Sequence, residues 1–289
     1  MAEGEITITH PERVVFPAAG ITKLALADYY RTVAPLMLPH LAKRPVSLVR
    51  CPRGRQKRCF YQKHHTGGFG PHVLSVAIAE KDGEREPYIW LDGAAGILEC
   101  VQMGAIEFHL WGSRVDRLEA PDRMVFDLDP DVGIGFGEVA RAASDLRARL
   151  ADMRLDSFAL LTGGKGVHVV VPLEPGHSWD AHRDFARALA QAMADAEPER
   201  FTATMSKARR KGKIFIDWLR NARGSTAVAP YAVRAREGAP IAAPVGWNEL
   251  AELQHARTYN AADGKHLLER AASATLAGWG EASQPLPGS

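Results

Sequence analysis

The segment Met124–Asp129 (MVFDLD) constrains this chain most, because it places two carboxylates directly behind an apolar run. Side chains alternate along a strand, so Asp127 and Asp129 share one face while the apolar residues between them enter a core. Like charges this close repel each other unless a cation lies between them. Carboxylate oxygens suit Mg²⁺ or Mn²⁺, which also bind substrate phosphates. The pattern predicts a divalent-cation site; a plain turn at Asp129-Pro130-Asp131 is the alternative.

A third carboxylate, Asp217, follows the apolar run in KIFIDWL (213–219). A lone charge at the end of a buried strand is costly, so it needs a partner. Near the other two aspartates it would complete a two-metal site of the kind that stabilises both oxygens in phosphoryl transfer. The alternative is an ion pair with Arg220 or Arg223.

The segment TGGKGVHVVVP (162–172) has the residue types that bind a triphosphate. Its glycines allow backbone N–H groups to approach phosphate oxygens, and Thr162, Lys165 and His168 add side-chain donors. The spacing is not a Walker A motif, because Lys165 opens a strand rather than a helix. A plain β-hairpin turn is the alternative.

The charges are almost balanced, with 36 Lys and Arg against 34 Asp and Glu in 289 residues. A nucleic-acid partner must therefore be held by local patches. Two basic runs qualify: CPRGRQKRCFYQKHH (51–65), which contains two aromatics, and SKARRKGK (206–213). A solvated face is the alternative for each run. We expect no membrane partner, because no apolar run is long enough to span a bilayer and the N-terminus has no signal-peptide pattern.

The chain has three cysteines, a low and odd number. We therefore expect no disulfide framework and a reducing, cytoplasmic location. Zinc binding by Cys51, Cys59, His64 and His65 is disfavoured, because seven residues separate the cysteines where two to four are usual. Two reduced thiols are the preferred interpretation.

Strand and helix patterns mix without strict βαβ alternation, which favours mixed sheets flanked by helices. The clearest compositional boundary lies near Arg114–Asp122. Strands are expected at 5–17 (as a strand or hairpin arm), 44–51, 106–111, 124–129, 157–161, 167–173, 212–219 and 228–235, with a hairpin about Asp82-Gly83. Helices are expected at 22–41 (kinked or ended by Pro35), at 93–105, from the Gly-rich loop after Asp129 to about Met153, at 178–196 and at 244–253. The segment 281–289 is expected to be a frayed tail or a linker.

In combination, FDLDP, LTGGKGVHVVVP and KIFIDWLRNARGSTAVAPYAVR resemble the polymerase domain of bacterial DNA ligase D, of the archaeo-eukaryotic primase superfamily. HPERVVFPAAGITKLALADYY, RPVSLVRCPRGRQKRCFYQKH and EFHLWGSR resemble its earlier segments. The resemblance covers about His10 to Leu253. It implies an α+β, primase-like fold in which mixed and antiparallel sheets form a central core flanked by helices. It also implies one domain over 1–289, with an N-terminal subregion to about 115, a catalytic subregion at 116–255 and a tail at 256–289.

The resemblance implies specific roles for several side chains. Two Mn²⁺ or Mg²⁺ ions would bind Asp127, Asp129 and Asp217, which are also the catalytic residues. The other residues implied to bind nucleotide or DNA are Thr162, Lys165, His168 and Arg234 for the nucleotide phosphates, His109 near its sugar, Arg13 and Lys23 for a DNA 5′-phosphate, and Phe60 and Tyr61 for stacking on the template. His10 stands where many relatives have Asn, and Tyr61 where they have Phe.

The implied activity is template-directed nucleotidyl transfer in non-homologous end joining, filling gaps and extending ends with a preference for ribonucleotides. The implied partners are DNA with 5′-phosphorylated gaps or double-strand breaks, NTP and dNTP, a Ku-like protein, and a ligase in the same or a separate chain. The implied location is the nucleoid in the cytoplasm. Arg209 and Arg210 lie in a Lys- and Gly-rich loop that we expect to close on the primer terminus.

Two other functions are compatible with parts of the sequence. VFDLDP is similar to the DxD of haloacid-dehalogenase-like phosphatases, but Pro130-Asp131 replaces the usual Gly-Thr and the motif lies mid-chain. A non-catalytic module that binds DNA ends would explain the basic runs and a KDGE hairpin (81–84) that contacts a second end, but not three metal-type aspartates.

Overall fold

The computed structural model describes residues 6–287, which form two compact units. The first unit contains the described residues up to Trp111 together with 228–242 and 259–272. The second contains 112–227, 243–258 and the described residues from 273 onward. The chain first leaves one unit for the other at Trp111–Gly112, just before the compositional boundary expected near Arg114–Asp122. The assignment of one domain to the whole chain stays a prediction.

In the first unit, helix α1 (Lys23–Leu41) begins where the sequence predicts, since the Thr22 hydroxyl accepts a hydrogen bond from the Ala25 N–H. Pro35 does not end this helix, which continues through Pro35 and Pro39. The apolar face of α1, including Tyr30 and other fully buried side chains, offsets the backbone hydrogen bonds lost at the prolines.

The first unit holds a four-stranded sheet in the order β13–β7–β3–β4. A separate β5–β6 hairpin turns at Asp82-Gly83 as expected, with Gly83 at φ 87°. The bounds are β1 Val14–Phe16, η1 Pro17–Ala19, β2 Ile21–Thr22, β3 Val46–Arg50, β4 Phe60–Gln62, β5 Leu74–Ala79, β6 Arg85–Trp90, α2 Ala94–Gln102, β7 Ala105–Leu110, β13 Ala227–Val228 and α6 Gly264–Ala271.

Two expected strands of this unit are shorter than predicted. Residues 6–13 form no strand and only β1 pairs with β2, while residue 5 of the expected segment lies outside the described part. In the segment 228–235, regular pairing stops after β13 and only the Val233–Ile241 bridge follows. Its apolar composition reflects burial of an irregular segment, in which residues 228–233 are all buried.

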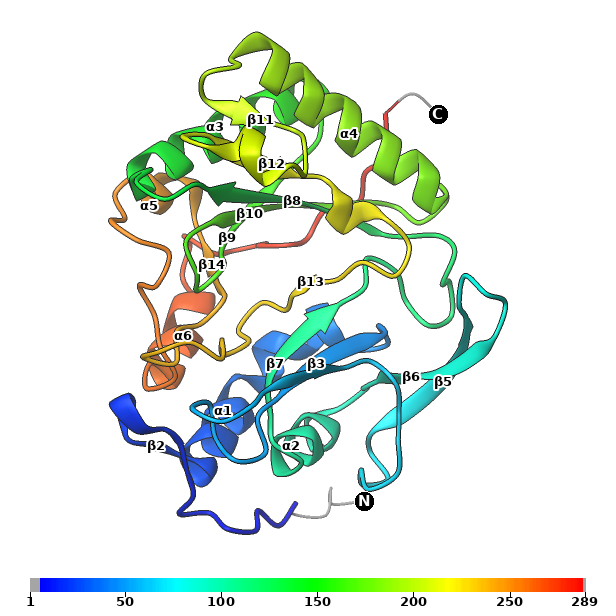
Figure 1. Ribbon diagram of the computed structural model, residues 1–289, viewed down its shortest axis with the longest axis vertical. Helices are drawn as coiled ribbons and strands as arrows, with labels where there is room; N and C mark the ends of the chain where they lie inside the picture. Colours follow the sequence, from blue (N-terminus) through cyan, green and yellow to red (C-terminus); the bar gives the residue numbers. More distant parts are fainter. Residues whose placement is uncertain (1–5, 288–289) are drawn as a thin grey trace. The chain divides into compact units, whose positions relative to one another are not determined.

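The second unit is built on a six-stranded sheet in the order β11–β12–β8–β10–β9–β14 (Figure 1). Neighbouring strands are antiparallel except β11 and β12, which are parallel. The bounds are β8 Arg123–Pro130, α3 Phe136–Asp152, β9 Phe158–Leu161, β10 Val167–Pro172, α4 Trp179–Ala196, β11 Phe201–Thr202, η2 Lys207–Arg210, β12 Ile214–Asp217, η3 Leu219–Asn221, β14 Ala243–Val245 and α5 Trp247–Leu250.

Helices α3 and α4 cover one face of this sheet (Figure 1). Phe126 and Leu128 on β8 are fully buried, as expected for side chains that face the helices. Strand alternation then places Asp127 and Asp129 on the opposite face. The core of the unit therefore fixes the direction in which the two carboxylates point.

The C-terminal segment is not frayed as far as it is described. The Gln284 side chain donates to the Pro172 and Asp156 carbonyls, and Leu286 is buried. The Pro- and Ser-rich composition that predicts a linker also suits an extended segment whose polar groups bond to neighbouring backbone.

The structure contradicts the prediction of two reduced thiols, because Cys51 and Cys59 form a disulfide. The sequence separation of eight residues is bridged because the loop between them turns back, bringing the two Cα atoms within 4.4 Å. Within residues 6–287, no group of three or more His, Cys, Asp or Glu side chains is arranged to hold a metal ion. Across the same residues, no helix has both the length and the apolar character needed to cross a bilayer.

Candidate active site

Three adjacent strands of the second unit bring the predicted acidic residues together. In the antiparallel ladders, Asp127 on β8 is paired with Asp217 on β12 and with His168 on β10. Directly paired residues project from the same face of a sheet. The register of these three strands therefore places Asp217 beside the DxD pair, as the sequence predicts.

Arg220 lies across the two paired aspartates. Its Nη2 is 3.1 Å from Asp127 Oδ2, and its Nε is 3.2 Å from Asp217 Oδ2. The side chain reaches both because it lies on η3, one turn after the end of β12. The alternative of a pair between Asp217 and Arg220 is thus real, whereas Arg223 pairs with Glu119.

The three carboxylates differ in their electrostatic surroundings. Burial would raise the pKa of Asp127, but His168, whose Nε2 is 3.5 Å from Oδ1, and Arg220 outweigh it and lower the pKa to about 2. Burial and the charge of Asp127 raise the pKa of Asp129. Burial also raises the pKa of Asp217 despite Arg220, and Asp127 adds to the rise. Burial is thus the largest influence on all three carboxylates, and cationic neighbours outweigh it only at Asp127.

All three side chains offer the oxygen ligands that a hard divalent cation prefers. In the described residues they are not arranged to hold a metal ion, and Arg220 bridges Asp127 and Asp217 instead. Asp129 is also accessible, with about half of its side chain (55%) exposed.

The glycine-rich segment forms the turn between β9 and β10, and its role in phosphate binding stays a prediction. The Thr162 hydroxyl donates to the Gly166 carbonyl and accepts from the Gly164 N–H, which fixes the turn. Lys165 is exposed at its tip. Arg257 donates from Nε to the Gly164 carbonyl, supporting the turn from a distant segment. The hairpin thus presents a lysine at the end of the strand that carries His168.

In the second basic run, Lys207–Arg210 form the short helix η2, and Arg210 lies close to residues of strands β8 and β12. Arg210 Nη1 is 3.8 Å from Asp129 Oδ2, and its guanidinium lies 3.6 Å from the Phe215 ring centre, while Arg209 is exposed. Asp131 accepts a hydrogen bond from the Gly212 N–H. Asp131 is therefore a loop anchor, consistent with the turn expected after Asp129.

In the first unit, Phe60 and Tyr61 on strand β4 are exposed rather than buried, with 41% and 74% of their surfaces accessible. The two rings are therefore not part of the core. The Arg50 guanidinium lies 5.4 Å from the Phe60 ring centre, and the Tyr61 ring meets the His109 ring edge-on at 6.0 Å. Exposed rings beside cations are the arrangement that stacks on nucleic-acid bases.

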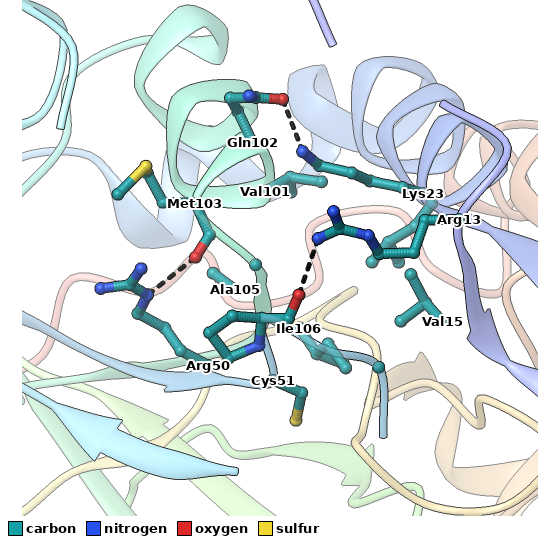
Figure 2. A pocket seen from close by; sticks show the side chains of 14 residues that line it. Arg13, Val15, Lys23, Arg50, Cys51, Val101, Gln102, Met103, Ala105 and Ile106 are labelled. Atoms are coloured by element: carbon teal, nitrogen blue, oxygen red, sulfur yellow. Dashed lines mark hydrogen bonds between the residues drawn. The ribbon is translucent and has the colours of Figure 1, made fainter. Parts of the chain in front are cut away.

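Arg13 and Lys23 line a pocket of about 200 Å³ in the first unit (Figure 2). Lys23 Nζ donates to the Thr9 carbonyl and to Gln102 Oε1, and Arg13 Nη1 donates to the Pro52 carbonyl. Burial lowers the pKa of Lys23, and the nearby Arg13 charge lowers it further. Two cations held this close would both gain from binding an anion.

His109 and Arg234 converge on a third residue, Glu107, which lies two positions before His109 on β7. The Glu107 Oε2 is 2.7 Å from His109 Nε2 and accepts from Arg234 Nε at 3.0 Å. The structure thus joins His109 and Arg234 through one buried carboxylate.

The family model described as LigD, primase-polymerase domain, matches residues 22–275. The chain belongs to the LigD primase-polymerase domain family. It is 42% identical over 259 residues to the multifunctional non-homologous end joining protein LigD of Pseudomonas aeruginosa, and 35% identical over 256 residues to that of Mycolicibacterium smegmatis. These matches span 90% and 87% of the chain but only 31% and 34% of the relatives, so the chain spans about a third of their length.

Among solved structures, the fold is similar to the polymerase domain of Mycobacterium tuberculosis Ligase D in complex with DNA. The TM-score is 0.85 at 32% sequence identity, covering 93% of this chain and 95% of that one. The expected α+β, primase-like fold is confirmed, and the chain is a nucleotidyltransferase domain of the primase-polymerase type. The family is one of metal-dependent polymerase domains. The phosphatase alternative is therefore wrong, and a purely non-catalytic module is not supported.

Sequence reasoning missed three residues that organise this LigD-type domain. Arg220 appeared only as an alternative partner, Glu107 was not considered, and Gln102, which accepts from Lys23, lies 79 residues away in the chain. Glu107 carried a usable signal, because it lies two residues from His109 on a strand and must share its face.

Proposed function

We propose that this domain is a template-directed primase-polymerase that fills gaps and extends broken DNA ends in non-homologous end joining. The observation that carries the proposal is the strand register, which pairs Asp127 of the DxD strand with Asp217 on one side and with His168, next to the glycine-rich hairpin, on the other. Membership of the LigD primase-polymerase family and the likeness to a DNA-bound polymerase domain support it. The whole-protein partners, a Ku-like protein and a ligase, belong to the same proposal.

Asp127, Asp129 and Asp217 would hold two divalent cations, Mn²⁺ or Mg²⁺. Such ions lower the pKa of the primer 3′-hydroxyl and neutralise the triphosphate. The chain itself supplies carboxylates whose separation is fixed, because the strands that carry them are hydrogen-bonded to each other in the sheet. Arg220 offsets part of the charge of Asp127 and Asp217, which limits the repulsion within the pair.

The nucleotide would be held by Lys165, His168, Thr162 and Arg234 at its phosphates and by His109 at its sugar. Lys165 is exposed at the hairpin tip, whereas the hydroxyl of Thr162 is engaged with the turn itself. Thr162 would therefore contribute mainly by shaping the backbone that approaches the phosphates. A preference for ribonucleotides would follow from a hydrogen bond between His109 and the 2′-hydroxyl, which can donate and accept.

The pocket of Arg13 and Lys23 would bind the 5′-phosphate of the downstream strand. An ammonium group has three donors, and the described residues engage two of those of Lys23. The pocket thus brings two positive charges and an N–H donor close together. Phe60 and Tyr61 would stack on the template, and Arg209 and Arg210 would act near the primer terminus.

The direct test is extension of a one-nucleotide gap with a 5′-phosphate, in Mn²⁺, supplied with NTP or dNTP. Asp127→Asn and Asp217→Asn keep the side-chain size and remove the charge. We expect both to reduce extension by at least 10²-fold, in the range found when a catalytic electrostatic group is removed, with DNA binding retained. Asp152→Asn, an exposed carboxylate on α3, is the matched control and should extend normally. Unchanged extension by either active-site variant would refute the assignment.

A further inference from the structure

Glu107 is a buried carboxylate that the roles proposed above leave unused. It is only 5% exposed, and it lies on β7 two residues before His109. Burying a carboxylate is costly unless it is fully hydrogen-bonded. We therefore expect the charge of Glu107 to contribute through the groups that it holds in place.

The carboxylate accepts hydrogen bonds from two segments of the first unit. His109 Nε2 lies 2.7 Å from Oε2, Arg234 Nε donates to the same oxygen at 3.0 Å, and the Ala235 N–H donates to Oε1 at 2.6 Å. These donors lower the pKa of Glu107 to about 2 even though burial would raise it, so the group is ionised at neutral pH. One charge thus fixes a histidine ring, a guanidinium and the backbone beside it.

The ionised carboxylate also determines the proton position on His109. A carboxylate only accepts, so the ring nitrogen that faces it, Nε2, carries a proton. The orientation of the His109 ring is therefore set by Glu107 rather than by the nucleotide.

The segment of Arg234 is held to β7 a second time. The Tyr30 hydroxyl donates to the Ile106 carbonyl on β7 and accepts from the Val233 N–H at 3.0 Å. Val233 and Ala235 thus bracket Arg234 with two backbone anchors, one to a tyrosine and one to Glu107. Removing Glu107 would leave the segment attached through Val233, but would take one hydrogen-bond partner from Arg234 and one from the Ala235 N–H.

We propose that Glu107 is a positioning residue that orients His109 and Arg234 together for the sugar and phosphates of an incoming nucleotide. The inference rests on the function proposed above, since it deepens the roles given there to those two side chains. Its distinctive consequence is coupling: sugar discrimination and phosphate binding depend on the same carboxylate.

Glu107→Gln is the informative variant, because it keeps the side-chain shape but offers one acceptor oxygen to three donors. Glu99→Gln is a matched control, since Glu99 is also a buried glutamate (6% exposed) that accepts from a histidine, His72, and from two backbone N–H groups. The assay is single-nucleotide gap filling with NTP and with dNTP, from which KM and kcat are obtained for each, alongside the melting temperature.

We expect Glu107→Gln to raise the KM for NTP about ten-fold or more, as for loss of a hydrogen bond to a charged group, with a smaller change in kcat. We also expect the preference for NTP over dNTP to shrink. In a His109→Ala background, Glu107→Gln should no longer change that preference, because its effect on the sugar runs through His109. Glu99→Gln should leave both KM and preference at wild-type values.

The possible failures are distinguishable. A wild-type protein that extends no primer would overturn the proposed function. An active wild type with an unchanged KM and NTP preference in Glu107→Gln would overturn this inference alone. Equal changes in KM for Glu107→Gln and Glu99→Gln would also overturn it, because they would reduce the role of Glu107 to general stability.

Discussion

Replacing Gly166 with alanine tests whether the close approach of β10 and β8 positions the carboxylates. A Cβ on Gly166 would lie 2.2 Å from the Leu128 carbonyl oxygen and 3.2 Å from its carbon. Both clashing atoms belong to the backbone of β8, so no flexible side chain can move aside. Asp127 Oδ1 is 3.7 Å from the same point. The clash therefore lies where the hairpin meets the β8 backbone, close to the Asp127 carboxylate.

The size of the effect follows from these distances. Ordinary contact begins at 3.4 Å, so the strands must separate locally by 3.4 − 2.2 = 1.2 Å. Overpacking of this kind costs about 1–3 kcal/mol, which lowers the melting temperature by about 2–12 °C at 2–4 °C per kcal/mol. A displacement near 1 Å in a catalytic site can cost about 10²-fold in rate. We therefore expect gap filling to fall about 10²-fold even at temperatures where the variant is fully folded.

The assay compares gap filling and thermal melting of Gly166→Ala with those of Gly137→Ala. Gly137 lies in the first turn of α3, and a Cβ there meets nothing within 4 Å. Alanine in a helix is favoured over glycine by about 0.5–1 kcal/mol, so Gly137→Ala should be as active as the wild type and no less stable. Wild-type melting and wild-type extension rates in Gly166→Ala would refute the reasoning, because the strands would then have room for the methyl group.

Other predictions concern the first unit. Lys23→Met should weaken binding to a 5′-phosphorylated gap much more than to the same gap without phosphate, and equal losses in a binding titration would contradict the phosphate pocket. Tyr61→Ala should weaken template binding by the equivalent of about 1–3 kcal/mol per base without changing the melting temperature, because the ring is 74% exposed; a lower melting temperature would indicate a packing role. The pKa of Glu107 falls from 4.5 to about 2 beside His109 and Arg234, a difference of 2.5 that corresponds to about 3 kcal/mol. That stabilisation is present above pH 4.5 and is lost as the pH falls to 2, so the melting temperatures of wild type and Glu107→Gln should differ most near neutral pH and converge in acid; a constant difference would contradict the charge-based explanation.

Local sequence was sufficient for many elements of the fold. Thr22 and Ser178 cap their helices as expected, because a cap depends only on the residues of the first turn. The strand with Asp127 and the hairpin with Lys165 also follow from short-range patterns. Pro35 does not end helix α1, because burial of one helix face outweighs the local loss of a hydrogen bond.

The candidate site depended more on contacts between distant residues. The Cys51–Cys59 disulfide contradicts a prediction based on cysteine number, because the path of the loop decides whether the two side chains meet. The partnership of Glu107 with Arg234 joins positions 127 residues apart. No local pattern encodes such a contact.

The amino-acid sequence by itself determined which residues could do the chemistry: carboxylates behind apolar runs, a lysine in a glycine-rich turn, and aromatics within a basic run. These features depend on residue type and on the two-residue repeat of a strand, both of which are short-range. The tertiary structure alone decided that Asp217 pairs with Asp127, that Arg220 lies across them, and that Glu107 joins His109 to Arg234. Strand register and buried ion pairs are set by packing between segments far apart in the chain, which is why they appear only when the whole fold is formed.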